Sequence, residues 1–378
     1  MDSYNSNNTN NTNGTNGTNG TGNVNNNELS VIVERLKSSD EKDLNDPDCK
    51  ISEVEVSSGD FLLKFPRGAY TSARTVKRKS IMDLQSHVSR MVHSLRLMKF
   101  IPESEVPTEK SQDNKENNEF EAEESSQITR ELIPYRKSDT FKQLIIPILR
   151  KGLSRYCEIK GLPSHNNKRE CEDEIKVTIL VCYSFKEKRP ILVAHFINLY
   201  SLNTSRCKVE IYGEPRKSAE AKDSQWVRDR KLLESSMQPG FNEIILLDSN
   251  TQNIYEGLSS NFFAVLYNPD KQEPLVVTAP IHHVLEGTIL KIVRMICERD
   301  KIDFQFWFPN ANDAEQWKGA FITSTSRLVL PIELIKFRNG RPLVKLPPHN
   351  NTIEHIKNEV EKEIFHRAYR ILCQRFYF

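Results

Sequence analysis

A series of segments concentrates the side chains that could do chemistry in this chain. In chain order they read GAYTSAR, HVSRM, AKDSQWVRDRKLLE, NEIILLDSNTQNIYEGLSSNFFAV, TAPIHHVLEGTIL and FITSTSRLVLPI. Lys222 offers an amine, a group that can attack a carbonyl carbon when it is uncharged. Glu256 offers a carboxylate, and Arg90 offers a planar guanidinium group of the kind that binds carboxylates and phosphates.

Several other kinds of site have no counterpart in the sequence. It contains no glycine-rich phosphate loop, no GxSxG elbow and no HExxH motif. The seven cysteines are an odd number and form no CxxC pair, which indicates reduced thiols and neither a zinc site nor a disulfide framework. His282 and His283 have no further ligand pattern, so we expect packing or surface roles and no metal site.

Composition limits the class of protein. The chain has 378 residues, which predicts two domains. Its 53 Lys and Arg nearly balance its 51 Asp and Glu, so we expect no nucleic-acid partner. No apolar run approaches the ~20 residues of a membrane-spanning helix. The amino terminus also lacks the basic and apolar parts of a secretory signal, and we therefore expect a cytoplasmic protein without membrane contact.

The pattern of residues divides the chain into a leader and two domains. Residues 1–50 begin with an Asn/Thr/Gly tract and predict a disordered leader, with order starting near Ile51. Residues 51–202 predict a small α+β domain, interrupted at about 102–128 by an acidic, polar insertion that we expect to be disordered. Residues 203–378 mix strand and helix patterns and predict a larger α/β domain with a mixed sheet.

Periodicity predicts the elements that position the reactive side chains. The stretch from Glu53 to Leu63 alternates and predicts a strand. Apolar residues at helical spacing from Ile81 to Phe100 predict an amphipathic helix that carries Arg90. A last helix, predicted from Ile353 to Gln374, should cover the core.

In their order along the chain, the reactive segments resemble the class IV aminotransferases, the fold type IV enzymes that use pyridoxal 5'-phosphate. This group includes branched-chain aminotransferases, D-amino acid aminotransferases and aminodeoxychorismate lyases. The resemblance runs from about Gly68 to Ile332, and its most specific part is YEGLSSNFF, which is similar to the family's (T/S)EG-x-x-x-N-(L/F)F segment. It implies a D-amino acid aminotransferase-like fold of two domains, with a small α+β amino-terminal domain and a larger carboxy-terminal domain.

The resemblance also implies which residues would bind the cofactor. Lys222 matches the lysine of the K-x-x-N-(Y/R)-L pattern, which forms the Schiff base and moves the substrate's α-proton. Glu256 resembles the glutamate that faces the pyridine nitrogen, and Arg90 matches the phosphate-binding arginine of H-x-x-R-L. If Lys222 is instead a solvated turn residue, Lys217 and Lys231 are the other candidates. The remaining implied cofactor contacts are Trp226, Leu285, Gly287, Thr288, Ile289 and Thr325.

The sequence departs from the family pattern near the implied phosphate site. Glu286 replaces a proline, and Ile289 replaces a threonine and so lacks its hydroxyl group. Trp226 stands where tyrosine or arginine is common. The candidates for binding a substrate carboxylate are Arg327 and, more weakly, Arg216 and Arg74. For each arginine a structural ion pair is an equally good interpretation.

The resemblance implies an aminotransferase that exchanges an amino group between an amino acid and a 2-oxo acid. A lyase of the aminodeoxychorismate type would use the same lysine and glutamate, so those residues do not separate the two reactions. A cofactor-binding homologue with little activity is a further alternative, which the altered LEGTIL turn motivates. The resemblance also implies a homodimer.

Overall fold

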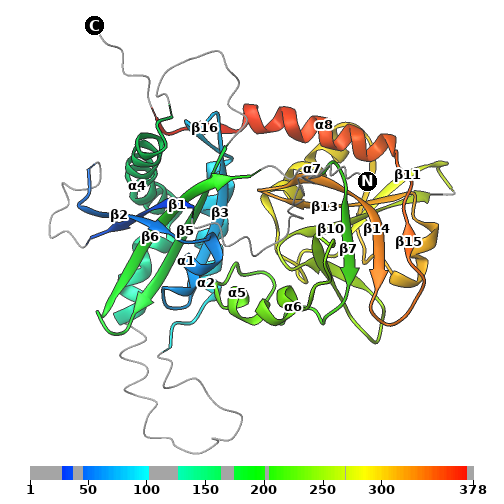
Figure 1. Ribbon diagram of the computed structural model, residues 1–378, viewed down its shortest axis with the longest axis horizontal. Helices are drawn as coiled ribbons and strands as arrows, with labels where there is room; N and C mark the ends of the chain where they lie inside the picture. Colours follow the sequence, from blue (N-terminus) through cyan, green and yellow to red (C-terminus); the bar gives the residue numbers. More distant parts are fainter. Residues whose placement is uncertain are drawn as a thin grey trace, which may run out of the picture.

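The computed structural model describes residues 28–36, 46–101, 127–162, 174–200, 204–268 and 270–372. These residues form two lobes that lie side by side (Figure 1), each built around one β-sheet. The Asn/Thr/Gly tract and nearly all of the acidic insertion at 102–128 lie outside the described residues.

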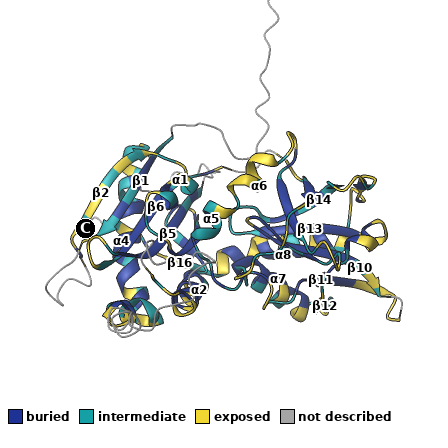
Figure 2. Cartoon of the chain, turned by 90° about the horizontal axis from the view of Figure 1, so that it is seen from below, coloured by how far each residue is buried: buried dark blue, intermediate teal, exposed yellow. Residues whose placement is uncertain are grey.

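The first lobe is built on a 7-stranded sheet in the order β16-β4-β3-β5-β6-β1-β2, and every pairing in it is antiparallel. β5 and β6 form its long central hairpin, and β2 is an edge strand whose residues are exposed or half-buried (Figure 2). The strands are β1 Leu29–Arg35, β2 Cys49–Glu55, β3 Gly68–Val76, β4 Ser80–Met82, β5 Glu174–Ser184, β6 Arg189–Leu199 and β16 Ala368–Arg370.

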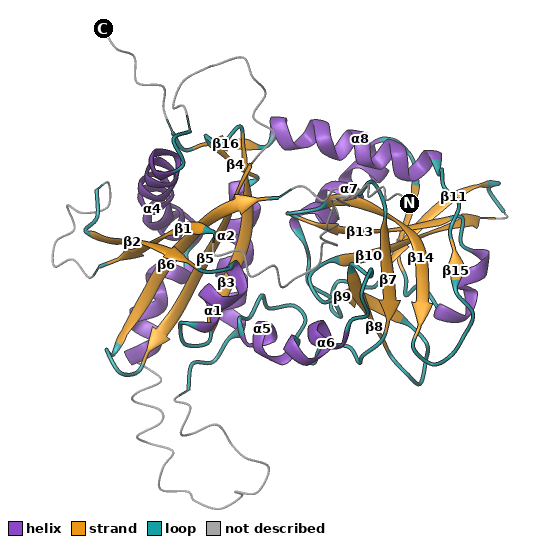
Figure 3. Cartoon of the chain, viewed as in Figure 1, coloured by secondary structure: helices purple, strands orange, loops and turns teal. Residues whose placement is uncertain are grey.

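Two of these strands correct the predicted boundaries. β1 lies inside the stretch assigned to a disordered leader, yet it pairs with β6 and β2 and buries Val31 and Val33 in the core. The prediction that order starts near Ile51 is therefore wrong. β16 lies near the carboxy terminus, but it pairs with β4 in the first lobe (Figure 3). The chain thus returns to its first sheet after building the second lobe.

The predicted strand from Glu53 to Leu63 is also corrected, because its second half is helical. β2 ends at Glu55, and helix α1 spans Ser58–Leu63. Ser57 caps this helix, since its Oγ accepts a hydrogen bond from the backbone N–H of Asp60 at 3.1 Å. Phe61 and Leu62 bury themselves against the sheet, so the cap and the burial together outweigh the alternating pattern.

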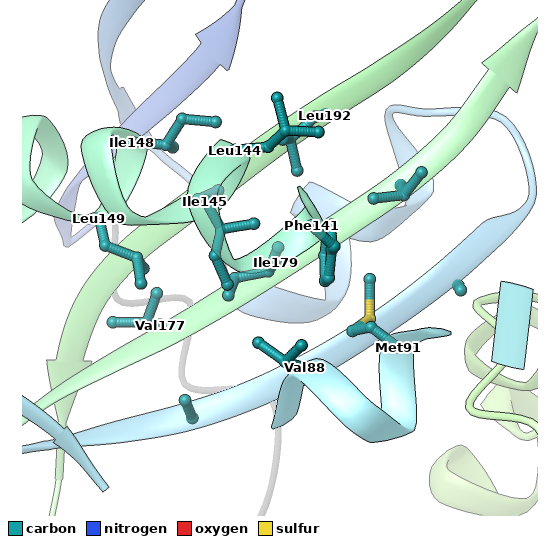
Figure 4. Packing of buried hydrophobic residues seen from close by; sticks show 14 of the residues in the cluster. Val88, Met91, Phe141, Leu144, Ile145, Ile148, Leu149, Val177, Ile179 and Leu192 are labelled. Atoms are coloured by element: carbon teal, nitrogen blue, oxygen red, sulfur yellow. The ribbon is translucent and has the colours of Figure 1, made fainter. Parts of the chain in front are cut away.

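Two helices cover one face of the first sheet. They are α2 Leu84–Leu97 and α4 Ser138–Ile159. Figure 4 shows Val88 and Met91 of α2 meeting the apolar side of α4 over Val177 and Ile179 of β5. The amphipathic helix predicted around Arg90 is confirmed, although Ile81 and Met82, at the start of the predicted range, belong to β4.

The second lobe is a barrel-like mixed sheet. Its 9 strands include the path β12-β11-β10-β13-β14-β7-β8-β9, and β15 pairs with β14. β9 pairs back with β10 through Asn261 and Glu256, which closes part of the path into a ring. The pairs β11–β12, β14–β7 and β7–β8 are parallel. The strands are β7 Cys207–Ile211, β8 Glu243–Leu247, β9 Ile254–Gly257, β10 Asn261–Asn268, β11 Glu273–Thr278, β12 Asp303–Phe306, β13 Gly319–Ser324, β14 Leu328–Phe337 and β15 Val344–Lys345.

The remaining helices join and cover the lobes. α5 lies at the junction of the lobes (Figures 1 and 2), with α6 directly after it. α8 packs on α7 and β14, but it ends at His366, so the helix predicted to continue to Gln374 is wrong over 367–372, and its last two residues lie outside the described residues. The described helices include none with the length and apolar character needed to cross a membrane. Their bounds are η3 Ile133–Arg136, α5 Gln225–Asp229, α6 Lys231–Ser236, α7 Thr288–Arg299, η4 Ala311–Gln316 and α8 Asn351–His366.

The packing of α4 on β6 gives a first prediction. A Cβ added to Gly152 would lie 2.0 Å from the Phe196 ring, so Gly152→Ala should lower the free energy of unfolding by about 1–3 kcal/mol in spite of alanine's better helix propensity. Gly59→Ala in α1 is the matched control, because its added Cβ would meet only Ser57 Oγ at 3.7 Å. Urea denaturation measures both. Equal stability of the two variants would contradict the packing described here.

Candidate active site

A cavity of about 270 Å³ lies where the two lobes meet. The first lobe contributes residues of α1, β3, α2 and β5, and the second contributes residues of α5, β9, β10 and the turn between β13 and β14. Among the lining residues are Arg90, Lys222 and Glu256, and the first and last of these are 166 residues apart in sequence. The fold therefore gathers the reactive segments of the sequence in one place.

The backbone of Lys222 is fixed by the first lobe, although the residue stands directly before α5. The Tyr70 N–H donates to the Lys222 carbonyl oxygen at 2.9 Å, and the Ser224 N–H donates to the Gly68 carbonyl oxygen at 2.9 Å. The Lys222 N–H donates to Ser94 Oγ on α2 at 3.0 Å. This segment thus runs along the edge of β3, and its backbone bonds aim the lysine side chain into the cavity.

The amine of Lys222 lies in a desolvated and positively charged environment. Burial lowers the pKa of this amine well below its ordinary value, and the cations Arg90, Arg216 and Arg230 lower it further, whereas Glu256 opposes them. The Nζ atom lies 4.7 Å from the centre of the Tyr70 ring. A lowered pKa leaves more of the amine uncharged near neutral pH, and this is the form that attacks carbonyl groups and accepts protons.

One end of the cavity is suited to an anion. Arg90 reaches it from α2, where its Nη1 donates to Thr288 Oγ1 at 3.2 Å and its Nη2 donates to Thr71 Oγ1 at 2.6 Å. Burial lowers the pKa of Arg90 to about 10, so the guanidinium group still carries its charge at pH 7. Thr325 lines the cavity from the turn between β13 and β14.

The amino terminus of α7 adds backbone donors at the same end. Gly287 caps this helix, and the first intrahelical bond runs from the Lys291 N–H to the Gly287 carbonyl, so the N–H groups of the first turn have no partner within the helix. A Cβ on Gly287 would lie 2.2 Å from Asn261 Oδ1. The Asn261 amide donates to the Leu285 carbonyl at 2.7 Å and so holds the turn in place. Such a helix start favours bound anions.

The structure accounts for two of the departures from the family pattern. Glu286, which stands where the family has a proline, forms an ion pair with Lys291, with 2.9 Å between Oε2 and Nζ. This ion pair compensates the negative charge of the Glu286 carboxylate. Ile289 is buried in the apolar cluster beneath α7. Its side chain therefore belongs to the core, and only its backbone N–H remains available to an anion.

Glu256 already has two partners. Its Oε1 accepts from Arg216 Nε at 2.8 Å, and its Oε2 accepts from the Leu285 N–H at 3.0 Å. Arg216 also stacks on Trp226, with 5.3 Å from its Cζ to the ring centre, while Trp226 Nε1 donates to the Leu258 carbonyl at 2.9 Å. Because two carboxylate oxygens offer about four acceptor positions, Glu256 can still accept a further N–H donor.

Arg327 forms the structural ion pair that was the alternative to a substrate contact. Its Nη1 pairs with Glu243 Oε2, and Glu243 is only 4% exposed. The same carboxylate accepts from Ser259 Oγ at 2.9 Å and Ser260 Oγ at 3.2 Å. Arg327 lines the cavity, but its charge is compensated, and its pair with Glu243 links β8 to the turn between β13 and β14.

Two cations of the cavity were missed by the sequence reasoning. Lys176 of β5 and Arg230, the residue that ends α5, both line it. Burial, followed by the charges of Arg230 and Arg327, lowers the pKa of Lys176 to about 8. Arg230 donates to the Leu258 carbonyl at 2.8 Å and pairs with Glu234. For Lys176, the available signal was a single charged residue within the mostly apolar run IKVTILV.

The other candidates lie away from the cavity. Arg74 pairs across the sheet with Lys176 but is not among the lining residues. Lys217 and Lys231 are exposed. His282 contacts Glu220, and His283 packs against aromatic rings. In the described ranges, no group of three or more His, Cys, Asp or Glu side chains is arranged to hold a metal ion.

Comparisons with known proteins agree with the resemblance seen in the sequence. Residues 68–335 match the sequence model of the family described as amino-transferase class IV. No curated protein matches the chain by sequence.

Several solved structures share the fold. A fold IV transaminase from Curtobacterium pusillum matches with a TM-score of 0.59 and 13% identity, over 89% of this chain and 99% of its own. A branched-chain aminotransferase from Thermoproteus uzoniensis matches with a TM-score of 0.56 and 13% identity, over 85% and 97% of the two chains. A protein described as a 4-amino-4-deoxychorismate lyase from Legionella pneumophila matches with a TM-score of 0.50 and 12% identity, over 78% of this chain and 91% of its own. At these identities the likeness confirms the expected fold.

The charge around Lys222 gives a prediction for its titration. Because its pKa is lowered, the amine should lose its proton and react with an amine-directed reagent at a lower pH than the exposed Lys217 does. Arg216→Met removes a cation that lowers this pKa and should therefore shift the Lys222 profile to higher pH. Peptide mass spectrometry after labelling across a pH series measures both lysines in one sample. Identical profiles for Lys222 and Lys217 would contradict the electrostatic description.

Proposed function

The chain belongs to the class IV aminotransferase family, whose members are pyridoxal-phosphate enzymes, and we propose that it exchanges an amino group between an amino acid and a 2-oxo acid. The observation that carries this proposal is the position of the Lys222 amine. It lies in one cavity with a carboxylate, Glu256, and with an anion site at Arg90 and the start of α7.

The residues of the cavity fit pyridoxal 5'-phosphate. Arg90 is 8% exposed, and its Nε has no hydrogen-bond partner among the described residues, so the guanidinium group keeps a donor for a ligand. The free N–H groups at the start of α7 suit the same phosphate. Gly287 and Thr325 line the cavity and would surround the phosphate, while Thr288 and Ile289, which are buried at the start of α7 and do not line the cavity, would contribute their backbone. Glu256 would face the pyridine nitrogen, and Trp226 would lie beside the ring.

The chemistry then divides between cofactor and protein. When bound, the cofactor supplies an aldehyde that takes up amino groups and a ring that withdraws electrons. Lys222 would hold the cofactor through its amine and would afterwards accept the substrate's α-proton at Nζ and return it. Both tasks need an uncharged amine, which the burial and the neighbouring guanidinium groups favour.

The substrates proposed here are acids, and the cavity has cations to receive them. Lys176 has no ion pair among the described residues, and Arg230 lies close enough to lower its pKa. We infer that Lys176 is the main attraction for the carboxylate shared by amino acids and 2-oxo acids, and that Arg230, which also pairs with Glu234, assists it. Arg327, whose charge Glu243 compensates, takes the smaller part in this attraction.

A catalytically weak homologue is the alternative that one contact favours. Arg216 already bonds to Glu256, and a cation at this carboxylate weakens its support for a positively charged ring nitrogen. A lyase of the aminodeoxychorismate type would keep the same cofactor contacts. Dependence on an added 2-oxo acid separates the aminotransferase from the lyase, because only an aminotransferase needs one to complete its cycle.

We also propose a cytoplasmic homodimer, as the family resemblance implies. Sedimentation of the purified chain tests whether it forms a dimer.

Retention of the cofactor tests the role of Lys222. The wild-type chain, mixed with pyridoxal 5'-phosphate, should keep the cofactor's visible absorbance through dialysis, whereas Lys222→Ala should lose it because the covalent anchor is gone. Lys217→Ala, an exposed lysine nearby in sequence, is the matched control and should behave as wild type. Loss of absorbance from the wild type, or its retention in Lys222→Ala, would rule out the proposed attachment.

The role of Lys176 gives a prediction for substrate binding. Lys176→Met keeps the length of the side chain but removes its charge, and it should raise KM for both acid substrates by about tenfold, the scale of one charged hydrogen bond. Retention of the cofactor should not change. Lys208→Met is the control, because Lys208 of β7 is half-buried, pairs with Glu333 and does not line the cavity. If KM were the same in wild type and Lys176→Met, another group would have to bind the carboxylate.

A further inference from the structure

Arg90 rests on two buried polar side chains of the first lobe, His87 and Thr71. Both are 0% exposed. Thr71 Oγ1 lies 2.8 Å from His87 Nδ1, and Arg90 Nη2 lies 2.6 Å from Thr71 Oγ1 and 3.1 Å from His87 Nδ1. The three side chains thus form a closed set of contacts beneath the anion end of the cavity.

The donors in this set determine the form of the imidazole. Arg90 can only donate, so His87 Nδ1 must accept, and its proton must sit on Nε2. The hydroxyl of Thr71 accepts from Arg90 and donates in turn to Nδ1, so the one lone pair of Nδ1 is shared by two donors. Burial, followed by the charges of Arg90 and Lys222, lowers the pKa of His87 well below its ordinary value, which agrees with a neutral ring.

We propose that His87 is a positioning residue, which holds the guanidinium plane of Arg90 in the orientation that a phosphate group needs. This inference rests on the proposed function. Arg90 Nη1 reaches Thr288 at the start of α7, while Nη2 is held from behind by His87 and Thr71. Without the acceptor at Nδ1, Arg90 keeps one fewer contact to fix its rotation, and the donors facing the cavity lose their alignment.

The second ring nitrogen argues that packing alone does not explain this histidine. His87 Nε2 has no hydrogen-bond partner among the described residues, and a buried donor without a partner costs stability. An apolar side chain of similar size would remove that cost. The imidazole provides an acceptor at Nδ1, and an apolar residue cannot provide this contact.

A pair of variants separates positioning from packing. His87→Asn places an amide oxygen close to the Nδ1 position, whereas His87→Leu fills a similar volume without an acceptor. Positioning predicts that the Leu variant binds pyridoxal 5'-phosphate about ten- to a hundredfold more weakly, the scale of a hydrogen bond to a charged group, and that Asn restores most of the affinity. Packing predicts the reverse order. Equilibrium titration with the cofactor gives both dissociation constants without any assay of turnover.

Unphosphorylated pyridoxal is the second probe in this experiment. Its affinity should be nearly equal in all three proteins, because it has no phosphate for Arg90 to bind. The role of His87 would be overturned if His87→Leu bound both compounds more weakly by the same factor, or if it bound both as tightly as wild type does. A wild type that does not prefer the phosphorylated compound would overturn the proposed function itself. Should His87→Leu fail to fold, His87→Met, a second side chain without a strong acceptor, takes its place beside His87→Asn in both titrations, with the same expected order.

Discussion

The site depends on an unfavourable arrangement of charges, in which the Lys222 amine shares a desolvated cavity with several guanidinium groups. Like charges in such surroundings disfavour the ammonium form, and Glu256 compensates only in part. The ion pairs of the cavity can be understood from this constraint. Arg216 is paired with Glu256 and Arg327 with Glu243, so these arginines are held in place around a lysine whose pKa is lowered.

The same arrangement explains why the site needs both lobes. Lys222 follows the second lobe's first strand, β7, in the chain, but it is held by backbone bonds to β3 and α2 of the first lobe. Arg90 comes from the first lobe and meets Thr288 of the second. Glu256 and Gly287 belong to the barrel-like sheet and the helix on it. Any movement between the lobes would therefore change the charge around the amine and the shape of the anion end together.

The sequence was informative where chemistry depends on local motifs. The motifs and their order indicated the family, interleaved strand and helix patterns indicated the mixed sheet, and apolar periodicity indicated the helix that carries Arg90. It could not indicate long-range pairings. β16 joins the first sheet only after the second lobe is complete, and β1 lies next to a low-complexity tract that masks its signal. The helix of α1 depends on one capping serine, which alternation does not reveal. The contacts of Lys176, Arg216 and His87 likewise depend on neighbours distant in sequence.

The most direct test of this account is the position of covalent attachment. The chain would be mixed with pyridoxal 5'-phosphate, reduced with borohydride to fix the cofactor in place, digested and analysed by peptide mass spectrometry. The account predicts a single modified peptide with the pyridoxyl group on Lys222. Modification of Lys176 or of exposed lysines instead, with Lys222 unmodified, would contradict it.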